Sequence, residues 1–293
     1  MKKCPICEKK FKKDQIIDAR DGYFYLICHF CSGGILMPRN RALKELKTAY
    51  QSQYFDWKEA EGLRKYLNKF RLYTSYTEWI SNTFFSKKGK LLDIGAGIPD
   101  FVLKMERNGW DSYALEISKD QVKLIGDYIK KNHVWQGDFE KKRISANFFD
   151  VLTFWHMLEH LINPAEAIRK SSQILKSNGM IFAEFPNFDS LNLKLFKQNY
   201  CHFDLPGHLV YYNKKSLKIL FEANGFKNIT ISYPLKLNGS FSLNLMKIVV
   251  LKTKLSFLGT AVFYITLPFS ILLSVMNSYI GKTDLMRISA VKA

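Results

Sequence analysis

The sequence predicts an α/β protein in which a mainly parallel β-sheet is covered by helices on both faces. Short apolar segments alternate with amphipathic segments from residue 90 almost to the last residue. A glycine-rich turn directly follows the first apolar segment. The chain has 293 residues, 47% of them hydrophobic and 15% aromatic, which is enough for one large core with small additions. We therefore expect one main domain.

Residues 1–38 differ from the rest and are expected to form a self-contained cysteine-rich module. Four of the five cysteines fall in two C-x-x-C pairs, Cys4 with Cys7 and Cys28 with Cys31, which are separated by twenty residues. This spacing is typical of a zinc ribbon, in which four thiolates complete a tetrahedral shell. The predicted site is structural zinc, and Cys201 is expected to remain outside it.

Residues 39–86 are expected to form a helical linker, because apolar residues recur every three or four positions. Such a segment joins the cysteine-rich module to the main domain and can also cover its active site.

Residues 87–293 are expected to form the main domain, with regular alternation of strands and helices. Ligands of such parallel sheets bind at the carboxyl ends of the strands, near the point where the connections diverge. The expected strands are 90–94, 112–117, 133–136, 149–155, 180–185 and 227–233, and the expected helices are 100–108, 119–130, 164–176 and 214–224.

The turn after the first strand has the sequence L-D-I-G-A-G, in which Gly95, Ala96 and Gly97 form a tight loop before a helix. A dinucleotide fingerprint needs a third glycine at position 100, where this chain has Asp100, so NAD is disfavoured. Asp93 lies two residues before the first glycine. A carboxylate there repels a pyrophosphate but suits the ammonium and sulfonium groups of S-adenosylmethionine.

Acidic residues also follow the next two strands. Glu116 ends the second strand at the position where a carboxylate accepts hydrogen bonds from ribose hydroxyls. Asp138 follows the third strand and can accept a hydrogen bond from an adenine amino group. Ile117 or Phe139 is expected to pack against the adenine ring. These spaced features together predict an S-adenosylmethionine site.

With these motifs the chain resembles the class I S-adenosylmethionine-dependent methyltransferases, and among them the small-molecule enzymes with an L-D-I-G-x-G loop and an H-x-L-E-H segment. The resemblance covers residues 91–226. It implies a Rossmann-like sheet of seven strands whose last strand is antiparallel, which residues 284–292 can supply. It also implies that Trp155 and His156 border the cofactor, while Glu159 and His160 face the substrate or support its loop.

A base that removes a proton from the acceptor is expected near the fourth strand. The candidates are His156, His160 and His208, with Tyr211 as a further substrate contact, and each histidine can instead serve to stabilise a loop. The H-x-x-E-H pattern of inverzincin proteases is rejected because here the motif follows a strand. Quinone O-methyltransferases, which this segment also resembles, hold a divalent metal with E-x-x-E-H, and this chain has His156 in place of the first Glu.

The formal charge of +18 admits two classes of acceptor. Cysteine-rich modules occur in ribosomal-RNA guanine methyltransferases and in some sugar C-methyltransferases. Arginine, the residue suited to reading phosphates and bases, is scarce here. We therefore prefer a small-molecule, glycan or lipid-linked acceptor, with rRNA or tRNA as the alternative. A third interpretation is a binding module that has kept the cofactor and lost catalysis.

Residues 256–280 contain no charged side chain and are long enough to span a bilayer. Pro268 is expected to divide them into two short helices, and lysines flank both ends. We expect a helical hairpin that packs on the core or contacts the membrane surface, with a lid, a dimer face or a true span as alternatives. Because no apolar signal follows the first methionine, the protein is expected in the cytoplasm, at the inner face of the membrane if the hairpin contacts lipid.

Overall fold

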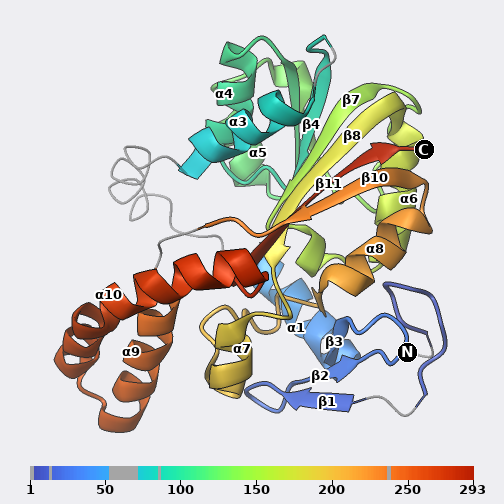
Figure 1. The fold of residues 1–293 in the computed structure, drawn as a ribbon. Helices are drawn as coiled ribbons and strands as arrows, with labels where there is room; N and C mark the ends of the chain where they lie inside the picture. Colours follow the sequence, from blue (N-terminus) through green and yellow to red (C-terminus); the bar gives the residue numbers. More distant parts are fainter. Residues whose placement is uncertain (1–2, 13–14, 53–71, 85–86, 236–238) are drawn as a thin grey trace.

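The computed structural model describes residues 3–12, 15–52, 72–84, 87–235 and 239–293. Its main feature is a seven-stranded sheet in the order β10-β11-β8-β7-β4-β5-β6 (Figure 1). Strands β4 to β8 are parallel, and β11 is antiparallel to both of its neighbours, as expected for the last strand. The strands are β4 (Lys90–Ile94), β5 (Asp111–Glu116), β6 (Val134–Gln136), β7 (Phe149–Trp155), β8 (Leu175–Pro186), β10 (Phe226–Ser232) and β11 (Leu285–Lys292).

Helices cover both faces of this sheet (Figure 1). Side chains of a strand point alternately to its two faces, and in β4 Leu91 and Leu92 belong to two different hydrophobic clusters. The cluster of Leu91 contains Phe101 of α4, and the cluster of Leu92 contains Leu217 of α8. The helices around the sheet are α3 (Leu72–Thr83), α4 (Asp100–Arg107), α5 (Lys119–Gly126), α6 (Pro164–Ile174) and α8 (Lys214–Glu222).

Local capping explains where these helices begin. The Ser118 side chain accepts a hydrogen bond from the Gln121 amide at the start of α5. Asn213 and Ser216 form a capping box at the start of α8. Of the expected linker 39–86, the structure describes α1 (Arg39–Ser52) and α3, while residues 53–71 lie outside the described ranges.

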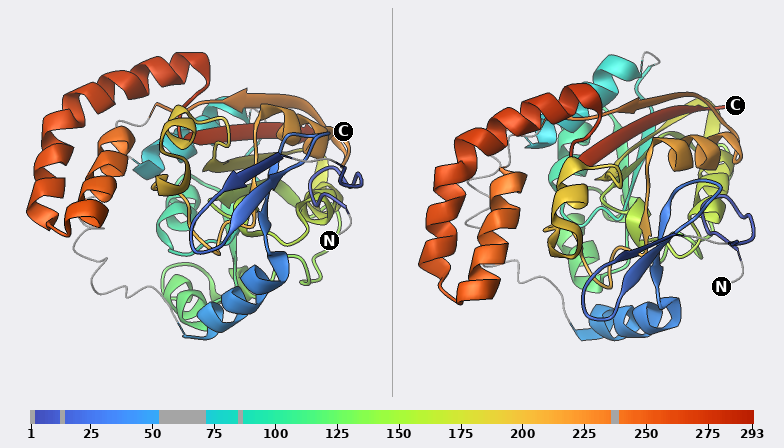
Figure 2. Two further views of the ribbon diagram at one scale, coloured as in Figure 1. Left: turned by 90° about the horizontal axis from the view of Figure 1, so that it is seen from below. Right: turned by 60° about the horizontal axis from the view of Figure 1, so that its bottom comes forward.

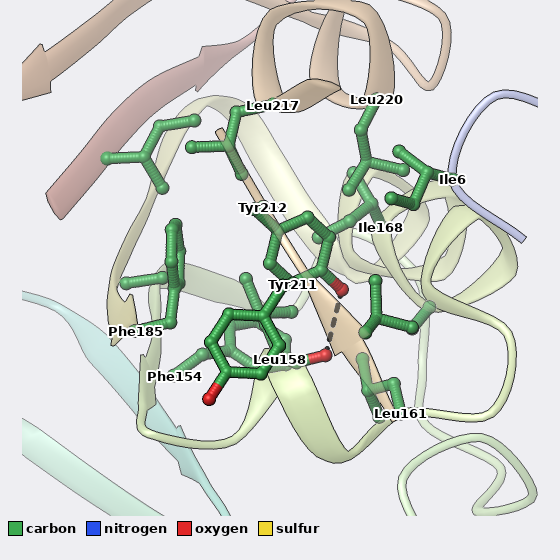
Figure 3. Close-up of a cluster of buried hydrophobic side chains, with 14 of the residues drawn as sticks. Ile6, Phe154, Leu158, Leu161, Ile168, Phe185, Tyr211, Tyr212, Leu217 and Leu220 are labelled. Carbon is green, nitrogen blue, oxygen red and sulfur yellow. Dashed lines mark hydrogen bonds between the residues drawn. The ribbon is translucent and has the colours of Figure 1, made fainter. Parts of the chain in front are cut away.

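The cysteine-rich module is joined to the main domain and is not self-contained, which corrects the expectation. Its strands β1 (Gln15–Asp18), β2 (Phe24–Ile27) and β3 (Gly34–Met37) form a sheet that is completed by β9 (Val210–Tyr211). Ile6 of the module lies beside Ile168 and Leu220 of the main domain (Figure 3). The two parts share one hydrophobic cluster because the module alone is too small to bury its apolar side chains.

A pair of helices is inserted between β10 and β11. They are α9 (Ser240–Thr253), which the sequence analysis did not anticipate, and α10 (Ser256–Ile280). The expected break at Pro268 is wrong, because α10 is one helix of 25 residues. Contacts with α9 on both sides of the proline hold α10 in line: Thr266 donates a hydrogen bond to the Ser242 hydroxyl, and the Ser242 amide donates to the Ser270 hydroxyl.

Buried Asp284 fixes the end of this insertion to the loop that follows β8. Its carboxylate accepts hydrogen bonds from Ser190 Oγ at 2.5 Å, Asn192 Nδ2 at 2.8 Å and Tyr200 Oη at 2.9 Å. Ser190 and Asn192 lie at the start of α7 (Leu191–Phe196). A single side chain therefore positions α7 and the following turn relative to β11.

Asp284→Ala is expected to lower the free energy of unfolding by about 3 kcal/mol, because it leaves three buried donors without an acceptor. Chemical denaturation measures this change. Asp127→Ala, at an exposed aspartate after α5, is the control and should change the stability by less than about 0.5 kcal/mol. Equal stability of the two variants would contradict the role assigned to Asp284.

Candidate active site

The glycine turn and the acidic residues meet at the carboxyl ends of four neighbouring strands, β7, β4, β5 and β6. Gly95 and Gly97 adopt positive φ angles of 72° and 58°, which allow the chain to turn sharply. The amides of Gly95 and Ala96 donate hydrogen bonds to the carbonyl of Leu115. The turn is thereby fixed to the end of β5, beside Glu116.

The Glu116 carboxylate is held in place by backbone amides. One oxygen accepts a hydrogen bond from Gly97 N at 3.0 Å, and the other accepts from Ile117 N at 2.7 Å and Ser118 N at 3.1 Å. Each carboxylate oxygen has two lone pairs, so capacity remains for a hydroxyl donor. The arrangement fits the predicted contact with the ribose of S-adenosylmethionine.

Asp93 is buried on β4 and accepts a hydrogen bond from Thr153 Oγ1 at 2.6 Å. Burial raises the pKa of Asp93 to about 8, although the bond from Thr153 acts in the opposite direction. Without a cation nearby, Asp93 is therefore mostly protonated at neutral pH. A cationic ligand close to it would favour the ionised form.

The residues predicted to surround the adenine lie at the ends of β5 and β6. Asp138 Oδ2 lies 3.1 Å from Lys141 Nζ, and its Oδ1 accepts a hydrogen bond from the Glu140 amide. Phe139 is fully buried, whereas Ile117 is 47% exposed. Of the two side chains considered for packing on the adenine, Ile117 is the accessible one.

Trp155 at the end of β7 stacks on Tyr76 of α3, with ring centroids 4.0 Å apart. The Tyr76 hydroxyl donates a hydrogen bond to Glu184 Oε1 at 2.6 Å, and Arg287 Nε donates to Glu184 Oε2 at 2.7 Å. The sequence analysis missed Tyr76, Glu184 and Arg287. Nothing in the sequence distinguishes this buried glutamate and arginine, since they come from strands that are distant in the chain.

His156 occupies a left-handed conformation with φ of 53° directly after β7. Its Nε2 lies 3.3 Å from Glu184 Oε1, and its Nδ1 lies 3.6 Å from Glu159 Oε1. Burial alone would lower the pKa of His156, but the two glutamates outweigh it and raise the pKa to about 9. A protonated imidazole cannot accept a proton, so His156 is the least suited of the three histidines to act as a base.

Glu159, His160 and His208 form the second group of polar residues at this end of the sheet. One donor atom from each lies within 4.8 Å of the others. His160 Nδ1 lies 2.9 Å from the Gly207 carbonyl, which can only accept, so Nδ1 carries the hydrogen. The Tyr211 hydroxyl donates to the His202 carbonyl, so its oxygen accepts from His208 Nδ1 at 3.0 Å. Both imidazoles thus keep a lone pair on Nε2.

This group has the donor set for a divalent cation. Both oxygens of Glu159 are buried and accept no hydrogen bond from any residue that the structure describes. A carboxylate and two neutral imidazoles, each oriented through Nδ1, are typical metal ligands. Compared with the E-x-x-E-H pattern, His208 would supply the third donor, because His156 Nε2 lies against Glu184.

The cysteines of the N-terminal module fit a zinc ion. The sulfur atoms of Cys4 and Cys31 are 3.7 Å apart, those of Cys7 and Cys28 are also 3.7 Å apart, and all four lie within 4.8 Å of one another. A tetrahedral ion with Zn–S bonds of about 2.3 Å places its sulfurs about 3.8 Å apart. Cys201 lies outside this group, on the loop after α7.

The fold, the glycine turn and the acidic residues define a class of S-adenosylmethionine-dependent transferases. A family model described as a methyltransferase domain matches residues 63–231, more than half of the chain. The chain belongs to this family of methyltransferase domains.

Curated relatives include two proteins named ubiquinone biosynthesis O-methyltransferase. The one from Photobacterium profundum is 28% identical over 142 residues, which cover 46% of this chain and 57% of the relative. The one from Yersinia enterocolitica is 27% identical over 132 residues, which cover 43% of this chain and 54% of the relative. The chain thus spans little more than half the length of these relatives.

Solved structures of S-adenosylmethionine-dependent methyltransferases share the fold. One from Thermotoga maritima has a TM-score of 0.52 at 14% identity and covers 80% of this chain and 95% of its own. One from Archaeoglobus fulgidus has a TM-score of 0.50 at 19% identity and covers 78% of this chain and 99% of its own. At these identities the likeness concerns the fold alone.

We expect one zinc ion per chain, and its removal by a chelator should reduce turnover about 100-fold while the cofactor dissociation constant stays within twofold. The module contacts the loop of His208, since Tyr25 Oη donates a hydrogen bond to the His208 carbonyl at 3.0 Å, and small displacements of catalytic groups are costly. Elemental analysis measures the zinc content, a methyl-transfer assay measures the turnover, and titration measures the cofactor dissociation constant. Cys28→Ser should lose the ion and Cys201→Ser should keep it; purified protein with no zinc would contradict the assignment.

Cofactor binding is expected to release close to one proton at pH 7, because the sulfonium cofactor favours ionised Asp93, whose pKa is about 8 in the free protein. The affinity should therefore rise with pH and level off above about 8. Calorimetry in two buffers of different ionisation enthalpy measures the proton count. Asp93→Asn should abolish this proton release. If the variant released as many protons as the wild type, the proton would come from another group.

Proposed function

We propose that this enzyme transfers a methyl group to a hydroxyl or amine of a small-molecule, glycan or lipid-linked acceptor, with His208 as the base. The observation that carries the proposal is the buried imidazole of His208. Burial lowers its pKa to about 4, and the nearby Glu159 offsets this only in part, so it is neutral at physiological pH. Its Nδ1 is engaged by Tyr211, so in the absence of a bound cation its Nε2 can accept a proton.

The histidine group lies beside the glycine turn. A Cβ atom added to Gly95 would lie 2.7 Å from Met157 Cγ, so the H-x-L-E-H segment contacts the turn directly. The His160 and His208 rings are 4.9 Å apart, which brings the loop after α7 to the same place. An acceptor held between them would be next to the cofactor.

When bound, S-adenosylmethionine supplies a methyl group on a positively charged sulfur. The acceptor oxygen or nitrogen attacks that carbon in line, a C–O or C–N bond forms, and the C–S bond breaks. The acceptor proton passes to His208 Nε2, and S-adenosylhomocysteine is the second product. Glu159 then lies 3.9 Å from the protonated Nε2 and stabilises its charge.

The class of acceptor is proposed from two features. The curated relatives are named for O-methylation in ubiquinone biosynthesis, a small-molecule reaction. The positive charge of the chain comes mainly from lysine, and lysine lacks the planar fork that suits arginine to nucleic acid.

The alternative, an rRNA or tRNA methyltransferase, is favoured by the net charge of +18 and by the zinc module. Binding that weakens steeply with salt would support it. For the preferred function we propose a cytoplasmic enzyme that works at the inner face of the membrane.

Incubation with methyl-labelled S-adenosylmethionine should label a lipid extract or a pool of water-soluble small molecules, and should leave purified tRNA and rRNA unlabelled. With the labelled pool as acceptor, His208→Gln should lower kcat about 100-fold or more, because the proton loses its acceptor. Scintillation counting of each fraction measures the labelling, and initial rates measure the change in kcat.

The control is cofactor affinity, which His208→Gln should leave within twofold of the wild type. Label in RNA alone would replace the proposal by the alternative. Retained turnover in His208→Gln would remove His208 as the base.

A further inference from the structure

Small and polar residues take part in the contact between α9 and α10. Ser242 of α9 is hydrogen-bonded to Thr266 and Ser270 of α10, whereas buried Ser240 and Asn244 of α9 face the loop that carries Cys201 and His202. In a water-exposed helix pair the contact would be made by large apolar side chains. Small residues and short polar side chains at a helix contact are typical of helices surrounded by lipid.

The close contact depends on these small residues. Gly259 faces Val250 and Met246 of α9, and any side chain at that position would collide with them. The buried residues of α10 are Gly259, Ser270 and Asn277, and their spacing of 11 and 7 residues places them on one side of the helix.

The opposite side of α10 is apolar and exposed. Eight large side chains on it are between 54% and 87% exposed, among them Phe257, Ile265 and Tyr279. Helical spacing places all of them within a stripe about half the circumference wide. The helix pair projects from the sheet as a separate arm, so this stripe is not covered by the body of the protein (Figure 2).

The arm is also positively charged. Residues 240–283 contain no Asp or Glu and four lysines: Lys247, Lys252, Lys254 and Lys282. Lys252 and Lys254 are exposed at the turn between the two helices. A second copy of this chain would bring the same lysines against each other, whereas an anionic lipid surface offers the opposite charge.

The pairing of β10 with β11 limits how the arm can enter a bilayer. By length and composition α10 could span one, because it has 25 residues and contains an 18-residue window with a mean hydropathy of 1.9. However, α9 and α10 connect β10 to β11, and these strands pair directly through Thr230 and Ser289. A single crossing would place paired strands on opposite sides of the membrane. The return would have to be made by α9, whose 14 residues extend only about 21 Å, less than the hydrocarbon core of about 30 Å.

We propose that the α9–α10 arm seats the enzyme on an anionic bilayer, with the apolar stripe of α10 immersed in one leaflet and the lysines among the headgroups. The arm contacts the loop that leads to the histidine group: Asn244 Oδ1 accepts a hydrogen bond from Cys201 N at 2.6 Å, and Ser240 Oγ lies 3.5 Å from His202 Nε2. Membrane contact of the arm does not rest on the proposed methyl acceptor.

Vesicle flotation of the full-length protein tests the proposal. The protein should bind vesicles of phosphatidylcholine with phosphatidylglycerol at least tenfold more tightly than vesicles of phosphatidylcholine alone. Lys252→Gln and Lys254→Gln should each weaken binding to the anionic vesicles about fivefold. The double variant Ile265→Glu/Tyr279→Glu should weaken it at least tenfold, because it places two charges in the apolar stripe.

The matched control is Ile16→Glu/Tyr128→Glu, which makes the same exchanges at exposed positions outside the arm and should bind within twofold of the wild type. Cofactor uptake by calorimetry should be equal in all variants, which verifies the fold separately from membrane binding. An alkaline wash should release the bound protein.

Failure of the wild type to bind either vesicle would overturn the proposal, as would equal loss of binding in the two double variants. Retention after the alkaline wash would overturn the in-plane orientation in favour of a span. A wild-type dimer that Ile265→Glu/Tyr279→Glu converts to a monomer, without vesicle binding, would identify a second copy as the occupant instead.

Discussion

The site depends on one buried carboxylate, Glu184, at the carboxyl end of β8. It accepts hydrogen bonds from Tyr76 of α3 and Arg287 of β11, and it lies 3.3 Å from His156 after β7. A buried charge is stable only when it is paired and hydrogen-bonded, so these partners cannot move apart at low cost. Three elements that are distant in the sequence are thereby held around the place where the parallel strands end. The stacking of Tyr76 on Trp155 and the unusual backbone of His156 follow from the same arrangement.

The cysteine-rich module contacts this site through the backbone of one loop. Strand β3 of the module pairs with β9, and Gly34 and Ile35 lie opposite Tyr211 and Val210. The same loop carries His208 and the Tyr211 hydroxyl that orients it. The module therefore supports the histidine group, whereas the glycine turn belongs to the main sheet.

Much of the fold could be predicted because its signals are local. The strand and helix alternation, the turn at Gly95 and Gly97, and the acidic residues Glu116 and Asp138 each lie within a few residues of the features that identify them. The remaining features arise from contacts between distant segments. The two-residue strand β9 exists only because β3 lies beside it, and His208 joins Glu159 only through the loop after α7. Pro268 suggested a break in α10 because its local effect was clear, while the supporting contacts from Ser242 were not visible in the sequence.

The position of the α9–α10 arm has a consequence for how this chain could be altered. Its two ends enter and leave neighbouring antiparallel strands, with Ser232 of β10 opposite Arg287 of β11. Strands in that relation can be joined by a short hairpin turn, so the sheet itself does not require the intervening residues. The arm is thus an insertion that could be exchanged for another segment without rebuilding the sheet, provided that the new segment keeps the contacts of Ser240 and Asn244 with the loop after α7.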